Sequence, residues 1–246
     1  HDSRTVLGVI PARYDSTRLP GKPLIELEGK KMIQHVYERA SRAKLIDDLV
    51  VATDDNRIVE AVEAVDGTPV MTDPDHVSGT DRVAEVAADR EPDLTINIQG
   101  DEPLIDPTVI DAVVEALRRN RPKVATPISA IDEATALDDE NTVKVVTDAD
   151  GRALYFSRSR IPARGGIENT YKHIGLYGFE TGVLLDYVEM DSTLEDAEDL
   201  EQLRLLENGY DIQTILTDYN APEVNVESDI PMVEKQLRRE QANEDN

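Results

Sequence analysis

The chain has 246 residues, of which 51 are Asp or Glu and 26 are Lys or Arg, so its formal net charge is −25. Such an acidic surface repels polyanions, which argues against nucleic acids and anionic membranes as partners. The absence of cysteine excludes disulfides, thiolate zinc sites and cysteine nucleophiles. No apolar run approaches the ~18 residues of a membrane span, and the first residues lack the apolar segment of a signal peptide, so we expect a cytoplasmic protein.

The acidic composition has two interpretations, a disordered chain or a folded protein adapted to high salt. Hydrophobic residues make up 39% of the sequence and recur in periodic blocks, which favours the folded protein. Screening by concentrated salt would relieve its self-repulsion. The length suits one α/β domain over residues 1–246, and we expect an ordered core over about 6–237 and a frayed tail over 240–246.

Apolar runs alternate with helical patterns at the spacing of βαβ units, which predicts a mostly parallel sheet. The expected strands are residues 6–10, 49–53, 69–71, 94–100, 123–127 and 143–147, and the expected helices are residues 32–43, 57–65 and 107–118, with a last helix after Pro231. The run 94–100 ends in a polar cluster at 99–103. Because ligands of open α/β sheets bind at such carboxyl ends, this cluster is a candidate site.

Residues 172–179 alternate with a period of two, which predicts a strand with two different faces. His173, Gly175 and Tyr177 lie on one face, and Ile174 and Leu176 lie on the other. One face can therefore bind a ligand while the other packs into the core.

Residues 194–208 carry apolar residues at helical spacing and end at Gly209, which is a favourable residue after a helix. This pattern predicts one helix. Glu201 and Gln202 then lie beside its apolar stripe.

Residues 11–24 follow the first strand and gather Arg13, Arg18 and Lys22 around a single carboxylate. In so acidic a chain, this excess of cations indicates a site for a phosphate-containing ligand, and Gly21 lets the backbone approach it. The alternative is a Pro/Gly turn with solvated charges. No Gly-x-x-x-x-Gly-Lys-Ser/Thr motif occurs and no Gly-x-Gly-x-x-Gly follows the first strand, which disfavours ordinary ATPases and dinucleotide dehydrogenases.

Asp101, at the end of a predicted buried strand, belongs to the polar cluster at 99–103 and is a candidate functional carboxylate. An Asp in a strand-ending turn is the structural alternative. Residues 76–82 form a further candidate, because they have the pattern of a helix N-terminus capped by Ser78 or Thr80. Helix N-termini also bind anions, so the two interpretations are compatible.

Six segments carry a family resemblance, and they are residues 13–24, 76–82, 99–103, 153–162, 173–177 and 200–204. In this order they resemble the 3-deoxy-manno-octulosonate cytidylyltransferases, or CMP-Kdo synthetases, and the resemblance extends over about residues 6–237. It implies a GT-A-like, Rossmann-related nucleotidyltransferase fold with a small additional sheet or dimerisation elaboration. It also implies transfer of CMP from CTP to the 2-hydroxyl of 3-deoxy-D-manno-octulosonate (Kdo), pyrophosphate release, dependence on Mg²⁺ and a homodimer.

The resemblance further implies roles for individual residues. The catalytic residues would be Arg13, Lys22 and Asp101, and the metal would be held by Asp101 and Asn225. The nucleotide would be bound by Pro11, Ala12, Arg13, Ser16, Lys22, Ser78, Gly79, Arg82 and Gln99. The sugar acid would be bound by Arg158, His173, Tyr177, Glu201 and Gln202. Taken singly, His173 could be structural and Glu201 could be a solvated helix residue.

Asn225 departs from the family pattern, which has a metal-binding Asp at this position. Asn225 could bind Mg²⁺ more weakly, a carboxylate such as Asp229 could replace it, or one metal position could be lost. Two alternative functions stay open, a CMP-sialate or related nonulosonate synthetase and a catalytically silent nucleotide-binding regulator. The run of residues 157–162 resembles the Kdo enzymes and favours the first interpretation over the sialate one.

Overall fold

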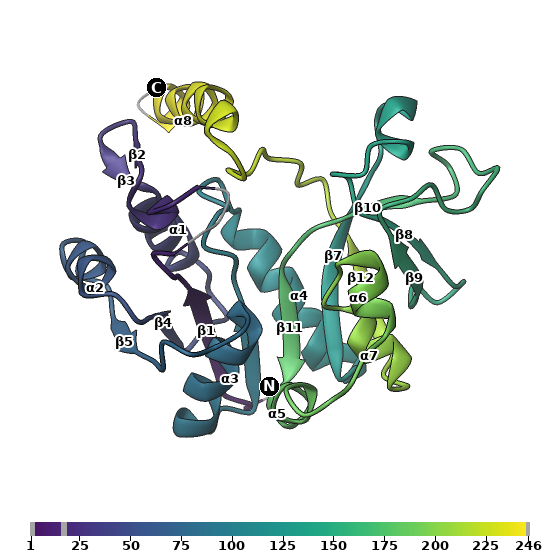
Figure 1. Cartoon of the computed structure of the whole chain (residues 1–246), viewed down its shortest axis with the longest axis horizontal. Helices are drawn as coiled ribbons and strands as arrows, with labels where there is room; N and C mark the ends of the chain where they lie inside the picture. Colours follow the sequence, from purple (N-terminus) through teal and green to yellow (C-terminus); the bar gives the residue numbers. More distant parts are fainter. Residues whose placement is uncertain (1–2, 16–18, 245–246) are drawn as a thin grey trace.

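The computed structural model describes residues 3–15 and 19–244 (Figure 1). Its strands are β1 (Val6–Pro11), β2 (Glu26–Leu27), β3 (Lys30–Lys31), β4 (Asp48–Thr53), β5 (Pro69–Met71), β6 (Leu94–Asn97), β7 (Val124–Ala130), β8 (Lys144–Thr147), β9 (Ala153–Ser157), β10 (Tyr171–His173), β11 (Tyr177–Glu180) and β12 (Ile212–Leu216). Its α-helices are α1 (Met32–Ala40), α2 (Asn56–Glu63), α3 (Gly79–Arg90), α4 (Pro107–Asn120), α5 (Thr181–Tyr187), α6 (Leu194–Glu198), α7 (Leu203–Glu207) and α8 (Ile230–Glu244). Short 3-10 helices are η1 (Lys22–Leu24), η2 (Ala134–Leu137) and η3 (Glu227–Asp229). None of the helices in these ranges is long and apolar enough to cross a bilayer.

Within the described residues, ten strands form one sheet in the order β5-β4-β1-β6-β11-β7-β10-β8-β9, with β12 also paired to β7. Strands β5, β4, β1 and β6 are parallel neighbours, and β7 and β12 are parallel to each other. The antiparallel strand β11 lies between β6 and β7, so β7 again runs in the direction of β6. The prediction of a mostly parallel α/β sheet is confirmed, and β2 and β3 form a small second sheet.

Two helical layers cover the sheet. The reason is visible in β1, whose successive side chains point alternately to the two faces. Val6 and Ile10 belong to a core cluster with residues of α1, α2 and α4, whereas Leu7 and Val9 belong to a second cluster with residues of α3, α5 and α7. Both faces of the central strands are therefore buried, as continuous apolar runs require. The carboxyl ends of these strands stay open for a site.

The C-terminal segment after β12 crosses from one half of the sheet to the other before it enters α8 (Figure 1). A third apolar cluster, which includes Leu27, Met32, Val224, Val233 and Leu237, packs α8 and this segment beside β2 and the start of α1. An ion pair of 2.5 Å between Arg39 and Glu240 adds to this contact. The last helix continues to Glu244, past the position where the sequence predicts a frayed tail.

The single strand predicted over residues 172–179 is wrong, because the structure contains two strands, β10 and β11, separated by a turn. The hydroxyl of Thr126, on the neighbouring β7, lies 3.3 Å from the carbonyl oxygen of Ile174 and 2.8 Å from that of Leu176. At this point the hydroxyl of Thr126 takes the place of the backbone hydrogen bonds that would continue one strand. The other strands and helices predicted up to residue 147 are present, with their ends shifted by at most three residues.

The single helix predicted over residues 194–208 is also wrong. Asp199 adopts a left-handed conformation with φ of 55°, and its N–H donates to the carbonyl of Glu195, which ends α6. The chain then turns and resumes as α7. Glu201 and Gln202 consequently lie in the turn between two helices, where they can face a cavity. Gly209 has φ of 81° after α7, in agreement with the predicted stop.

Candidate active site

The loop after β1 is held in shape by two glycines. Gly21 has φ of 69°, and its N–H donates to the carbonyl of Tyr14 at 2.9 Å, which closes the loop before η1. A Cβ on Gly100 would lie 2.9 Å from the carbonyl oxygen of Pro11, so glycine lets the segment after β6 approach the end of β1. The carboxyl ends of these two neighbouring strands thus meet at one point.

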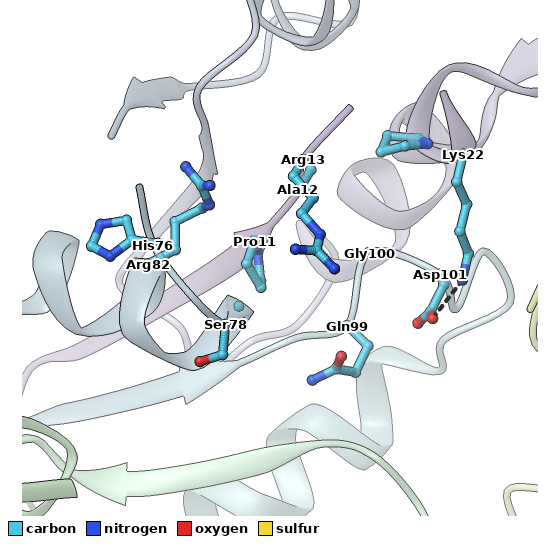
Figure 2. Close-up of a pocket in the computed structure, with 12 residues that line it drawn as sticks. Pro11, Ala12, Arg13, Lys22, His76, Ser78, Arg82, Gln99, Gly100 and Asp101 are labelled. Carbon is cyan, nitrogen blue, oxygen red and sulfur yellow. Dashed lines mark hydrogen bonds and ion pairs between the residues drawn. The ribbon is translucent and has the colours of Figure 1, made fainter. Parts of the chain in front are cut away.

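Lys22 and Asp101 face each other across this junction (Figure 2). Lys22 Nζ donates to Asp101 Oδ2 at 2.8 Å, and the two side chains are 16% and 27% exposed. Figure 2 also shows the guanidinium of Arg13 projecting from the loop towards the same space. Two cations of the loop, Arg13 and Lys22, and the carboxylate at the end of β6, which the sequence predicts in one site, are therefore brought together.

The N-terminus of α3 forms another wall of this space. Ser78 is the N-cap and accepts a hydrogen bond from the N–H of Asp81, whose carboxylate accepts from the Ser78 N–H in return. This capping box leaves the first turn of α3 at the cavity, where Gly79 lies next to Pro11. The cap interpretation and the ligand-site interpretation of residues 76–82 are thus compatible in this fold.

Arg82 lies at the same wall, but its guanidinium is bound by the protein. It is 2% exposed and donates to Thr72 Oγ1 at 2.5 Å, to the carbonyl of Asp73 at 3.2 Å and to Asp54 Oδ2 at 3.3 Å. These contacts tie α3 to the segments that follow β4 and β5. Arg82 therefore supplies positive charge to the cavity from a fixed position.

The residues just described enclose a first cavity of about 260 Å³. Its lining is Pro11, Ala12, Arg13, Lys22, Pro23, His76, Ser78, Gly79, Arg82, Gln99, Gly100 and Asp101. Arginine and lysine side chains outnumber the single carboxylate. Within an otherwise acidic chain this cavity suits a polyanion.

A second cavity of about 650 Å³ shares Gln99 and Asp101 with the first. Its further lining includes Asn141, Arg158, Lys172, His173, Gly175, Tyr177, Asp199, Glu201, Gln202, Glu223, Asn225 and Asp229. Here carboxylates outnumber the basic side chains. Carboxylates and amides accept hydrogen bonds from hydroxyl groups, so this cavity suits a polyhydroxylated ligand.

His173 has a neutral imidazole in this cavity. Burial lowers its pKa to about 3, its Nε2 lies 2.9 Å from Thr126 Oγ1, and its ring packs between Phe156 and Tyr177 at centroid distances of 5.0 and 5.3 Å. Burial also raises the pKa of the Tyr177 hydroxyl, which therefore stays protonated. Neither group can supply the positive charge that a ligand carboxylate needs, which leaves Arg158 and Lys172.

Glu201 and Gln202 present polar groups to the cavity from the turn between α6 and α7. Thr80 Oγ1 donates to Glu201 Oε2 at 2.8 Å, and burial raises the pKa of the Glu201 carboxyl. Gln202 is 3% exposed, and its Nε2 has no hydrogen-bond partner in the described part of the chain. A buried amide donor without a partner is costly, so a ligand acceptor at this point would satisfy it.

Carboxyl groups crowd around Asp101 where the C-terminal segment passes. The N–H of Val224 donates to the carbonyl of Asp101 at 3.1 Å, which fixes Glu223 and Asn225 beside it. Burial, together with the charges of Glu223 and Asp101, raises the pKa of Glu102 to about 8. Both backbone N–H groups of residues 225 and 226 bind Asp229 Oδ2, at 2.8 and 2.9 Å. Asp229 is therefore already used to shape this segment.

All the site residues predicted from the sequence, except Ser16, line one of the two cavities. Ser16 lies outside the described residues, and so does Arg18 of the predicted cation cluster. Sequence reasoning missed Lys172 and Glu223, which line the second cavity. His76, in the candidate segment 76–82, lines the first. Lys172 directly precedes His173 in a segment already chosen, whereas nothing in the sequence pairs Glu223 with Asp101.

Comparison with known proteins finds similarity to cytidylyltransferases. A cytidylyltransferase family model matches residues 7–212. The 3-deoxy-manno-octulosonate cytidylyltransferase of Thermodesulfovibrio yellowstonii is 45% identical, over 93% of this chain and 96% of the relative. The 8-amino-3,8-dideoxy-manno-octulosonate cytidylyltransferase of Shewanella woodyi is 46% identical, over 93% of this chain and 97% of the relative.

The solved structure of a CMP:2-keto-3-deoxy-manno-octonic acid synthetase complexed with CTP has the same fold. Its TM-score is 0.92 at 43% identity, and the match covers 96% of this chain and 99% of that one. The match of a family model over most of the chain and the near-complete alignment with these relatives agree with the six sequence segments that carry the resemblance. The chain belongs to the cytidylyltransferase family, among the 3-deoxy-manno-octulosonate cytidylyltransferases.

Proposed function

We propose that this protein transfers CMP from CTP to the 2-hydroxyl of Kdo. The hydroxyl oxygen forms a bond to the α-phosphorus of CTP, the bond from that phosphorus to the bridging oxygen of the β-phosphate breaks, and pyrophosphate leaves while the hydroxyl proton is released. The observation that carries this proposal is a pair of adjoining cavities, one cationic and one rich in hydrogen-bond acceptors, that share Gln99 and Asp101. Such a junction suits transfer between a nucleotide and a sugar.

In the first cavity, Arg13 and Lys22 would hold the triphosphate. Positioning and charge stabilisation are most of what phosphoryl-type transfer requires of a protein, and charge-assisted hydrogen bonds from these side chains supply both. Ser78 and Gly79 would contact the nucleotide through the N-terminus of α3, and Gln99 would lie between nucleotide and sugar.

The residues around Asp101 fit the Mg²⁺ that this chemistry needs. Within the described ranges no three His, Asp or Glu side chains form a complete metal site. Mg²⁺ is normally bound by one or two protein oxygens together with phosphate oxygens and water, so Asp101 and the amide oxygen of Asn225 are a suitable donor set. When bound, Mg²⁺ would neutralise charge on the phosphates. Lys22, paired with Asp101, would then be free to turn towards the triphosphate.

In the second cavity, Arg158 and Lys172 are the cations available for the carboxylate of the sugar acid, because His173 is neutral. The Tyr177 hydroxyl, the Glu201 carboxyl and the unpartnered Gln202 amide would bind the sugar hydroxyls. With a pKa of about 3, His173 is also a poor proton acceptor, and we assign it no role as a general base.

The test is pyrophosphate release from CTP in the presence of Mg²⁺ with Kdo, with its 8-amino analogue, with sialic acid and with no sugar. We expect release with Kdo and none without a sugar acid. Release with sialic acid and not with Kdo would contradict the proposal and would indicate a nonulosonate synthetase. Absence of release with every sugar acid, in protein that still binds CTP, would favour a silent nucleotide-binding regulator.

We further propose a cytoplasmic homodimer. Strand β9 ends the path of the main sheet, and Leu154 on it is 61% exposed. An unpaired edge strand with an exposed apolar side chain is a common place for contact with a second copy. Light scattering coupled to size exclusion tests this state, and a monomer at high concentration would contradict it.

A further inference from the structure

Lys144 is a fully buried lysine whose ammonium group binds backbone rather than carboxylate. It lies on β8 with 0% exposure, its Nζ donates to the carbonyl of Asp139 at 2.8 Å, and it makes a second hydrogen bond to the carbonyl of Arg158. Burial lowers the pKa of this ammonium group. A buried charge is expensive, and here its donors join two loops at the rim of the second cavity.

Glu198 binds Arg158 from the other side. Its carboxylate accepts from the backbone N–H of Arg158 at 3.1 Å and from Ser157 Oγ at 2.9 and 3.0 Å. Glu198 is the last residue of helix α6, whereas Lys144 lies on strand β8. The N–H and the carbonyl of Arg158 are therefore each bound by a charged side chain from a different element.

The guanidinium of Arg158 is oriented by the segments that these two residues anchor. Its Nε donates to the carbonyl of Glu198 at 3.1 Å, Nη1 donates to that of Glu140 at 3.2 Å, and Nη2 donates to that of Asp199 at 3.2 Å. Asp139, which Lys144 binds, directly precedes Glu140. These three acceptors are neutral carbonyls, and Nη2 also forms an ion pair of 3.7 Å with the carboxylate of Asp199, which is 84% exposed. A ligand carboxylate would compete with this solvent-screened partner for the guanidinium.

We propose that Lys144 and Glu198 are positioning residues that fix Arg158 for the carboxylate of the sugar acid. This inference rests on the proposed function, in which Arg158 binds that carboxylate. Lys144 fixes the backbone of Arg158 from β8, and Glu198 fixes it from α6. Neither residue reaches the nucleotide cavity, so their effect is confined to the sugar acid.

The experiment compares steady-state kinetics of Lys144→Met, Glu198→Gln and Arg158→Ala with Lys123→Met as control. Lys123 is exposed and lies outside both cavities. We expect the KM for Kdo to rise roughly tenfold to a hundredfold in Lys144→Met, because small displacements of a positioning group have effects of this size. The rise should be smaller in Glu198→Gln, which keeps one acceptor oxygen. The KM for CTP, and CTP binding measured by calorimetry, should stay at wild-type values.

The outcomes separate this inference from the function on which it rests. If Arg158→Ala leaves the KM for Kdo unchanged, the proposed carboxylate site is wrong. If Arg158→Ala raises it and neither Lys144→Met nor Glu198→Gln does, the positioning role is overturned. A parallel loss of CTP affinity would show a general structural role and would also overturn it. Should Lys144→Met fail to fold, Glu198→Gln decides by the same criterion.

Discussion

Replacing Glu102 by Gln should make the protein more stable at alkaline pH and leave it nearly unchanged in acid. Glu102 is 6% exposed, and the hydroxyl of Tyr219 lies 3.5 Å from its Oε2. Burial and the charges of Glu223 and Asp101 raise its pKa from 4.5 to about 8. A pKa increase of this size corresponds to about 5 kcal/mol against the ionised form in the folded protein.

The direction of the pH dependence follows from where the proton resides. Between pH 4.5 and about 8 the folded protein keeps the proton on Glu102 and the unfolded chain has lost it. Stability therefore falls as the pH rises through this window and stays low above it. Glutamine has the same shape and no charge, so Glu102→Gln removes this loss. At about pH 9 the variant should be more stable than wild type by several kcal/mol, and at about pH 4 the two should agree within ~1 kcal/mol.

The assay is urea unfolding followed by circular dichroism at both pH values, in concentrated KCl and with EDTA so that no metal binds the neighbouring carboxylates. Glu63→Gln, at an exposed position on α2, is the matched control and should show no pH-dependent difference. A Glu102→Gln protein that gains the same stability at both pH values, or that loses stability at alkaline pH, would refute the reasoning.

Three further predictions concern the metal site and the surface. Asp101→Ala should lower kcat at least ~100-fold in the pyrophosphate assay, and near-normal turnover would contradict its catalytic assignment. Asn225→Asp should tighten Mg²⁺ binding in the presence of CTP by roughly tenfold, because it adds a charge beside Asp101; unchanged affinity in calorimetry would exclude residue 225 from the metal. The thermal midpoint should rise from dilute buffer to concentrated KCl, since screening relieves the self-repulsion of a chain with net charge −25. Equal midpoints would exclude salt adaptation.

The parts of the fold that the sequence predicts are those whose cause is local. Val6 to Ile10 must be covered on both faces because every residue but glycine is apolar, and Gly209 must end a helix because it accepts φ of 81°. The break in residues 172–179 has a different origin, since Thr126 binds two carbonyls of this segment from another strand. No pattern within residues 172–179 contains that information.

The same distinction applies to the site. Arg13, Lys22 and Asp101 are recognisable because they lie in the segments that follow two predicted strands, and strand ends of a parallel sheet meet. Glu223 could not be found in this way, because it lies in an irregular segment that the hydrogen bond of Val224 holds beside Asp101. Lys144 is also hidden, since a lysine in a strand is normally taken as exposed, and only the folded chain reveals its 0% exposure.

The opposite character of the two cavities explains how so acidic a protein can use an anionic nucleotide and an anionic sugar. The cations of the first cavity are Arg13, Lys22 and Arg82, and Lys22 is paired with Asp101 at 2.8 Å. The phosphates must therefore compete with Asp101 for Lys22. The phosphates would draw Lys22 away from Asp101, and this exposes a carboxylate to a divalent cation when the nucleotide arrives. On this argument Mg²⁺ and CTP would bind with positive coupling, and the ion pair between Lys22 and Asp101 would couple them.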